Sequence, residues 1–215
     1  MEKNKVIILI PSLNEIKSLK RICYSLKKNR LNFIVLDDCS TDGTEKWLKT
    51  NNINYLRNKK ILGYENNIKK GIYHVSKNKN FKFLITFDGD GEHKVHYIYK
   101  IIKNKTFNNF DLLICNRKKL NRWSEYLLSF FSNKIIGVKD PLTGFKVYKI
   151  SELIKYKNRI NPNFFLVDIV INFYKRRKII RNYHIKTYKK KYSRIGHGFI
   201  VHLKIIKILF RLIFR

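Results

Sequence analysis

Apolar residues in the first ninety positions form short, nearly continuous runs, and amphipathic stretches separate these runs. Short apolar runs predict buried strands, whereas apolar residues spaced three or four apart predict helices. The predicted strands cover 6–10, 33–36, 54–57 and 81–87, and the predicted helices cover 15–29, 44–50 and 66–77. Buried strands that alternate with helices are typical of a parallel sheet with helices on both faces. We therefore expect an α/β fold with a mostly parallel sheet.

The C-terminal segment predicts a separate helix. No repeat or low-complexity linker divides the 215 residues, so we expect one main domain over 1–198 and a helix over 199–215. In that helix Lys204, Lys207, Arg211 and Arg215 fall within about 80° of arc, and the rest is apolar except for His202. So wide an apolar face has two possible uses. It can pack on the main domain, or it can lie in a bilayer interface with its bases toward anionic headgroups.

The charge is strongly basic, with 47 Lys and Arg against 15 acidic residues and a formal charge of +32. An apolar content of 44% excludes a disordered polyelectrolyte. Residues 169–215 contain 14 basic residues and no acidic one, which predicts an anionic partner such as a phosphate-rich ligand, a membrane or a nucleic acid. A basic nucleic-acid-binding protein is one candidate class, although no recognisable motif of that class accompanies the charge.

The cysteines and the N-terminus predict a cytoplasmic protein. Cys23, Cys39 and Cys115 are widely spaced, so neither a disulfide framework nor a zinc site is expected. The apolar run before Pro11 is too short for the core of a signal peptide. No apolar stretch reaches the length of a transmembrane helix.

Polar residues follow the predicted strands directly. Asn14-Glu15, Asp37-Asp38 and Asp88-Gly89-Asp90 each come after an apolar run. Ligands of such folds bind beyond the carboxyl ends of parallel strands, so we expect these groups to lie close together there. Carboxylates that converge on one edge repel each other unless a cation or hydrogen-bond donors compensate.

The segment 87–93 carries the most specific chemistry. Asp88, Asp90 and Glu92 alternate with two glycines that permit a tight turn, so the three carboxylates can point into one pocket. Hard oxygen ligands of this kind suit Mg²⁺ or Mn²⁺ while the phosphates of a substrate complete the coordination shell. The alternative is an acidic β-turn, because Asp and Gly favour turns in any case.

Four sequence blocks together resemble one family. PSLNE at 11–15, DDCSTDGT at 37–44, NKKILGYENNIKKG at 58–71 and DGDGEH at 88–93 match, in order and spacing, the inverting glycosyltransferase family 2. The segment at 116–149 resembles the acceptor side of dolichyl- or polyprenyl-phosphate sugar synthases. The resemblance implies a GT-A (Rossmann-like) catalytic domain over 1–198.

The resemblance also implies a donor site made of residues at the motif positions of that family. Its nucleoside pocket would include Pro11, Asn14 and Glu15, and Asp37 and Asp38 would bond the base or ribose. Gly63 and Lys69 would lie near the nucleotide. Asp88, Gly89 and Asp90 would form the DxD motif that holds Mg²⁺ or Mn²⁺ on the diphosphate, with Asp90 as the direct ligand and Glu92 as a third oxygen ligand.

On the acceptor side, the resemblance implies that Arg117, Lys146 and Arg194 clamp a phosphate. Asp140 and Asp168 would occupy the acidic positions, and either would serve as the base if the acceptor were a sugar hydroxyl. Lys146 stands where the family has Arg, which keeps the charge but loses the bidentate geometry.

The implied activity is transfer of a sugar from a nucleotide sugar to a polyprenyl phosphate. A glycan of lipopolysaccharide or of another surface polysaccharide is the alternative acceptor. A lipid acceptor favours attachment of helix 199–215 to an anionic membrane surface, with the protein on the cytoplasmic face and no nucleic acid as partner. The helical spacing of Trp123, Tyr126, Leu127, Phe130 and Phe131 suits either a core or contact with a lipid tail.

Overall fold

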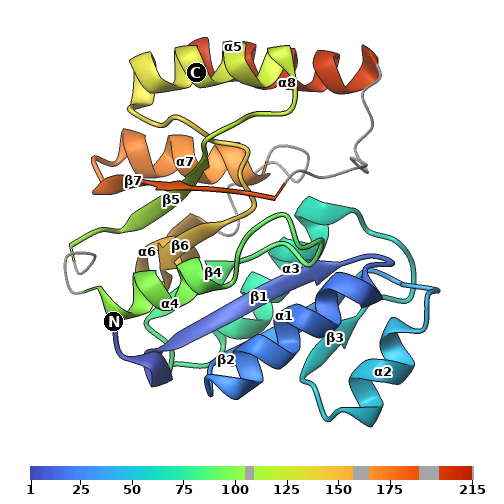
Figure 1. Cartoon of the computed structure of the whole chain (residues 1–215). Coiled ribbons are helices and arrows are strands. Elements are labelled where there is room, and N and C mark those ends of the chain that lie inside the picture. Colours follow the sequence, from blue (N-terminus) through green and yellow to red (C-terminus); the bar gives the residue numbers. More distant parts are fainter. Residues whose placement is uncertain (105–108, 157–164, 189–198, 215) are drawn as a thin grey trace.

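A computed structural model describes residues 1–104, 109–156, 165–188 and 199–214, and its described strands form one seven-stranded sheet (Figure 1). The strands are β1 (Val6–Ser12), β2 (Asn32–Asp37), β3 (Tyr55–Arg57), β4 (Phe83–Thr86), β5 (Leu112–Arg117), β6 (Lys146–Lys149) and β7 (Ile180–Ile185). Their order is β3-β2-β1-β4-β6-β5-β7, and only β6 runs antiparallel to its neighbours. The expected mostly parallel α/β sheet is confirmed.

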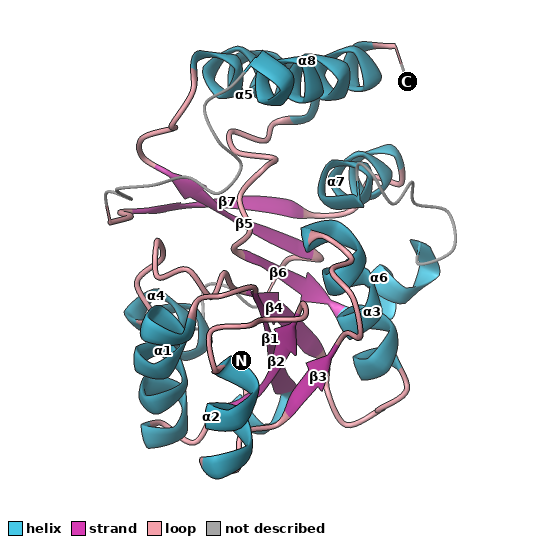
Figure 2. Ribbon diagram, turned by 90° about the vertical axis from the view of Figure 1, so that its right-hand side faces the viewer, coloured by secondary structure: helices cyan, strands magenta, loops and turns pink. Residues whose placement is uncertain are grey.

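Helices cover both faces of this sheet (Figure 2). They are α1 (Ile16–Lys28), α2 (Thr44–Thr50), α3 (Tyr64–Ser76), α4 (His96–Lys103), α5 (Trp123–Ile136), α6 (Ile150–Leu153), α7 (Phe165–Lys175) and α8 (Phe199–Ile213). Side chains of β1 alternate between two cores, because Ile8 and Ile10 pack with α1 and α4, whereas Ile7 and Leu9 pack with α3 and α7. Burial on both faces explains why the strands read as continuous apolar runs.

The parallel register brings the ends of three strands to one edge. Ser12 of β1 pairs with Asp37 of β2, which in turn pairs with Arg57 of β3. Beyond the strands, the amide of Asp38 donates to the carbonyl of Ser12 (2.9 Å), and the amide of Gly89 donates to the carbonyl of Pro11 (3.2 Å). The loops after β1, β2 and β4 are therefore neighbours, as the sequence predicts.

Helices α5 and α8 lie side by side above β5, β7 and α7 in the view of Figure 1. One face of α8 is buried in the core that α3 and α7 share; its side chains are Val201, Ile205, Ile208, Leu209 and Leu212. Ser124 of α5 hydrogen-bonds to His202 (2.8 Å), whose ring stacks on Trp123. The predicted helix is thus present, and one side of it packs on the protein. Among the residues described, no helix is both long and apolar enough to cross a bilayer.

Candidate functional site

The loops after β1 and β2 are held together by Asn14. Its backbone adopts a left-handed conformation (φ 53°), and its amide donates to Ser40 Oγ (2.9 Å). Its side-chain Oδ1 accepts a hydrogen bond from the amide of Thr41 (2.7 Å). Asn14, predicted to line a nucleoside pocket, therefore joins the two loops that such a pocket requires.

Asp37 and Asp38 are buried, and their carboxylates bind other residues of the protein. Asp37 forms an ion pair with Arg57, and Asp38 accepts bonds from Asn58 Nδ2 (2.9 Å) and from the amides of Leu62 (2.8 Å) and Gly63 (2.9 Å). The family resemblance implies contacts of these carboxylates with a base or ribose. In the structure Asp38 shapes the loop after β3, where Gly63 takes the positive φ (82°) that favours glycine, and Asp37 holds Arg57 at the end of β3.

A buried amide network below this loop was not predicted as functional from the sequence. Asn58 donates to Asn67 Oδ1 (2.9 Å), Asn67 donates to the carbonyl of Leu36 (2.8 Å), and Lys70 Nζ reaches Asn58 Oδ1 (2.6 Å). Lys69, the predicted neighbour of the nucleotide, is half-buried beside Lys70. Asn58 and Asn67 both lie in the block at 58–71 that resembles the family, which is the one signal in the sequence that could have singled them out.

Asp88 lies at the centre of the site. Tyr64 Oη donates to its Oδ1 (2.6 Å), and His93 Nε2 lies 3.4 Å from its Oδ2. His93 is 3% exposed, and its ring faces the carboxylate of Asp88, the first acidic residue of the DxD motif. A Cβ at Gly144 would lie 2.1 Å from Asp88 Oδ2, so the backbone approaches the carboxylate too closely for any larger residue.

The predicted donor residues Pro11, Glu15 and Gly89 are also in contact. A Cβ at Gly89 would lie 2.9 Å from the carbonyl oxygen of Pro11 and 3.0 Å from Glu15 Oε2. Gly89 therefore lets the turn after β4 pass close to the loop after β1. The residues predicted from four separate sequence blocks meet at one edge of the sheet.

Asp88, Asp90 and Glu92 are the predicted ligands of a divalent cation. Within the described residues, no three His, Cys, Asp or Glu side chains are arranged to hold a metal ion. Glu92, the predicted third oxygen ligand, lies 3.9 Å from Arg117 Nη1, and its role as a metal ligand stays a prediction. Asp88 and Asp90 still suit Mg²⁺ or Mn²⁺, since one or two carboxylates are enough when substrate phosphates supply the other ligands.

On the acceptor side, Arg117 is bound to two acidic residues. Its Nε lies 2.8 Å from Asp140 Oδ2 and its Nη2 lies 3.1 Å from Asp140 Oδ1, and Nη2 also meets Glu125 Oε2 at 3.3 Å. Burial alone would raise the pKa of Asp140, but the Arg117 guanidinium holds it below its usual value. Glu125 is also paired with Arg122, which immediately precedes α5.

Lys146 lies in the same region but has no exposed surface. Its ammonium group donates to the carbonyl of Thr143, and burial lowers its pKa from 10.5 to about 8, with Asp140 and Asp88 opposing that shift. A direct clamp on an acceptor phosphate, as the resemblance implies, does not match a fully buried side chain. The structure instead places this cation in the field of Asp88 and Asp140.

Asp168, the second predicted catalytic base, is buried and paired with Arg211. It has no exposed surface, and its two oxygens accept bonds from Arg211 Nε (2.7 Å) and Nη2 (2.8 Å) across the α7–α8 interface. This pairing favours a structural role for Asp168, and its predicted catalytic role stays a prediction. Arg194, the third predicted phosphate ligand, lies outside the described residues.

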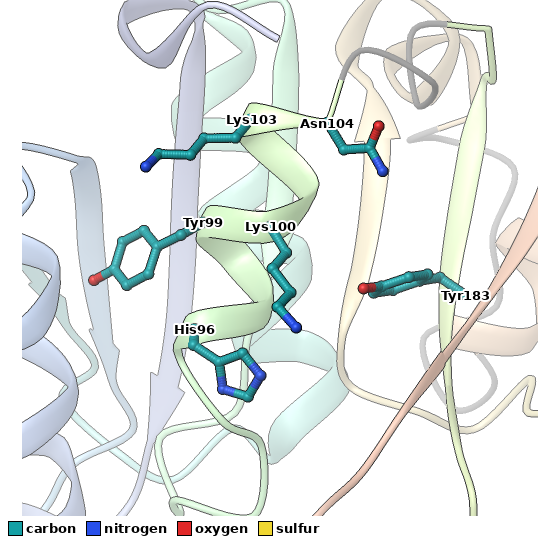
Figure 3. Close-up of a pocket in the computed structure, with 6 residues that line it drawn as sticks. All are labelled: His96, Tyr99, Lys100, Lys103, Asn104 and Tyr183. Carbon is teal, nitrogen blue, oxygen red and sulfur yellow. The ribbon is translucent and has the colours of Figure 1, made fainter.

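A separate open pocket of about 510 Å³ adjoins α4 and contains none of the predicted site residues (Figure 3). Its lining residues are His96, Tyr99, Lys100, Lys103, Asn104 and Tyr183. Burial and the neighbouring lysines lower the pKa of His96, and Tyr99 is bound to the carbonyl of Ser25 in α1 (2.8 Å). The pocket is basic but lacks the paired carboxylates of the main site.

Paired carboxylates after a central strand of a mostly parallel sheet define a candidate nucleotide-dependent transferase of the α/β class. The sequence model of glycosyl transferase family 2 matches residues 7–123, which is more than half of the chain. The protein belongs to this family of glycosyltransferases.

Two relatives are uncharacterized proteins of Methanocaldococcus jannaschii. MJ0544 is 29% identical over 163 residues, which are 67% of this chain and 71% of that protein. MJ1222 is 30% identical over 118 residues, which are 54% of this chain and 48% of that protein.

Among solved structures, the fold is similar to glucosyl-3-phosphoglycerate synthase of Mycobacterium tuberculosis in complex with UDP. The TM-score is 0.74 at 14% identity, over 97% of this chain and 80% of that one. The same enzyme with Mn²⁺, UDP and glucosyl-3-phosphoglycerate gives a TM-score of 0.72 at 14% identity, with the same coverage. At such low identity the similarity shows the shared GT-A fold.

Proposed function

We propose that this glycosyltransferase moves a sugar from a nucleotide sugar to a polyprenyl phosphate, with inversion at the anomeric carbon. The observation that carries the proposal is the pair Asp88 and Asp90 at the end of β4, next to the loops after β1 and β2. In a member of this family, that edge is suited to hold the diphosphate and the nucleoside of the donor.

The donor diphosphate is the leaving group, and its negative charge must be compensated. Asp88 and Asp90 would hold Mg²⁺ or Mn²⁺, which when bound supplies that compensation. Tyr64 and His93 keep the Asp88 carboxylate in one position, so the ligand is pre-arranged. Because the solved enzyme binds UDP-glucose with Mn²⁺, these two are the first donor and metal to test.

The state of Asp140 supports an acceptor that is already anionic. A phosphate oxygen attacks without losing a proton, whereas a sugar hydroxyl needs a base. Both oxygens of Asp140 are bound by Arg117, which lowers its pKa and makes it a poor base. The glycan alternative requires Asp140 to leave this pair.

The basic residues then divide into two roles. We propose that Arg117, which contacts Asp140, Glu125 and Glu92 and keeps 9% of its side chain exposed, contacts the acceptor phosphate together with Arg194. Buried Lys146 would act through Asp88 and Asp140, by balancing their charge. The protein would work on the cytoplasmic face of the membrane, with the anionic bilayer surface and not nucleic acid as its partner.

The test is a transfer assay with the full chain, Mn²⁺ and a panel of nucleotide sugars. The acceptors are a detergent-dispersed polyprenyl phosphate, 3-phosphoglycerate and a neutral oligosaccharide. We expect lipid-linked product, and no product after EDTA treatment or with Asp90→Asn, because an amide is a much weaker ligand for a hard cation.

The matched control is Asp111→Asn, which changes a carboxylate immediately before β5, away from the DxD segment, and should leave transfer intact. Product on 3-phosphoglycerate or on the oligosaccharide, but not on the lipid, would replace the proposed acceptor. Full turnover in EDTA would contradict the metal-dependent mechanism.

A further inference from the structure

The outward sides of α5 and α8 form one exposed apolar surface, which we call the α5–α8 face. Its principal side chains are Trp123, Leu127 and Phe130 of α5 and Phe199, Phe210 and Phe214 at α8. Phe199 is 76% exposed, Phe214 is 78% exposed and Trp123 is 60% exposed. Contiguous apolar surface of this kind marks an interaction site in a folded protein.

The opposite side of each helix explains why this face cannot turn inward. Leu128 of α5 and Leu209 of α8 are buried in the core, so both helices already pack on the protein with another side. Arg211 adds an ion pair to Asp168, which fixes the rotation of α8. The exposed residues Phe199, Leu203 and Phe210 fall within about 40° of arc on α8, away from the buried side. The α5–α8 face is therefore a fixed surface.

The charges around this face are of one sign. Between residue 112 and the C-terminus the sequence has four acidic residues, Glu125, Asp140, Glu152 and Asp168. All four are buried and all four are in ion pairs. The lysines of the two helices and of the loop before α5 are exposed; they are Lys118, Lys119, Lys134, Lys204 and Lys207.

Exposed aromatic and apolar side chains together with exposed lysines favour an anionic membrane as the partner. Nucleic acid matches exposed lysines but gives no reason for exposed Phe and Leu. Protein interfaces are depleted in lysine. Apolar and aromatic side chains with flanking lysines suit the interface of an anionic bilayer, where the rings enter the acyl boundary and the ammonium groups meet the headgroups.

We infer that the α5–α8 face docks the enzyme on an anionic membrane. The face begins beside the acceptor side of the site. Trp123 directly follows Arg122, and both Arg122 and Arg117 form ion pairs with Glu125. Docking there brings the acceptor side of the site near the headgroups. The inference rests on the proposed function for its choice of partner, but its test is a binding measurement that needs no turnover.

The experiment is flotation of the full chain with vesicles of phosphatidylcholine containing phosphatidylglycerol, and with vesicles of phosphatidylcholine alone. We expect binding to the anionic vesicles. The double variant Phe210→Ser/Phe214→Ser should lower the partition coefficient at least about tenfold, since burial of one phenyl ring contributes more than that factor. These rings are exposed and stack on each other, so the fold should persist.

A charge-reversal pair separates specific docking from general attraction to a basic protein. Lys204→Glu/Lys207→Glu should weaken binding about tenfold or more. The matched control, Lys17→Glu/Lys28→Glu on α1, makes the same change of net charge at exposed positions and should have a smaller effect. In a Trp47→Phe background, the emission of Trp123 should shift to the blue on anionic vesicles.

Absence of vesicle binding by the full chain would overturn the inference, and so would equal binding by the Phe210→Ser/Phe214→Ser variant. A dimer in solution that this variant splits, without any vesicle binding, would assign the face to a second copy instead. If vesicles bind but polyprenyl phosphate is not an acceptor, the docking surface stands and the proposed acceptor fails.

Discussion

The ion pair between Asp168 and Arg211 gives a direct test of whether Asp168 stabilises the fold or takes part in catalysis. Asp168 is fully buried on α7, and Arg211 binds both its oxygens from α8 at 2.7 and 2.8 Å. Arg211→Met removes the cation but keeps an apolar stem of similar length. The buried carboxylate would then lose the guanidinium that binds both its oxygens from α8.

The expected cost follows from the burial of the pair. Loss of one partner from a buried ion pair costs about 3–5 kcal/mol. The Arg211 side chain is 24% exposed, so water can reach the truncated site, and we take the lower end, about 3 kcal/mol. For a chain of this size each kcal/mol shifts Tm by about 2–4 °C, so Arg211→Met should lower Tm by about 6–12 °C.

The assay combines thermal unfolding with the transfer rate. The double variant Asp168→Leu/Arg211→Leu removes both charges together, and replacement of a buried pair by apolar residues is often neutral in stability. We therefore expect the double variant to recover most of the lost Tm. Measured well below Tm, its transfer rate to a detergent-dispersed acceptor should stay within about twofold of wild type if the pairing of Asp168 with Arg211 is its structural role.

Two results would refute this reasoning. If Arg211→Met unfolds at the wild-type temperature, the pair does not hold α8 on α7. If the double variant is as stable as wild type but transfers sugar a hundredfold more slowly or worse, Asp168 is a catalytic residue, as the family resemblance implied.

Two further predictions concern the centre of the site. Gly144→Ala should abolish transfer, because the added Cβ would lie 2.1 Å from Asp88 Oδ2 and displace that carboxylate. The control Gly137→Ala, where a Cβ meets nothing within 4 Å, should only lower Tm. Initial rates and unfolding curves of both variants check this. Burial depresses the Lys146 pKa from 10.5 to about 8, so the unfolded chain binds more protons between those values and stability should rise with pH from about 8 to 10.5. Lys146→Met should flatten that rise in urea unfolding measured at several pH values, and an unchanged slope would contradict it.

The sequence predicted the sheet and the edge of the site well, because both depend on local pattern. Strands buried on both faces appear as apolar runs, and parallel strands necessarily place their following residues at one edge. Asn14, Asp38 and Asp88 could thus be placed together without knowledge of any contact. The glycines between the carboxylates predicted a tight turn, and at Gly89 the backbone does pass close to the carbonyl oxygen of Pro11.

The partners of single charges could not be predicted in this way. Asp168 meets an arginine 43 positions later, and Asp140 meets one 23 positions earlier, and no periodicity connects such pairs. Glu92 had the spacing of a metal ligand, but a nearby guanidinium lies within 4 Å of it. The apolar circumference of α8 was visible in the sequence, yet the sequence did not show that the protein would bury one side and leave the other exposed.

Helix α5 links the acceptor side of the site to the α5–α8 face. Trp123 and Glu125 are two positions apart, about 200° around the helix, so one faces outward while the other faces the site. Glu125 binds Arg117, and Arg117 binds Asp140. A rotation of α5 that withdrew Trp123 from a bilayer would therefore also pull Glu125 from its arginine and expose a buried carboxylate. Because that loss is costly, the orientation of the apolar face and the geometry around Asp140 are fixed together.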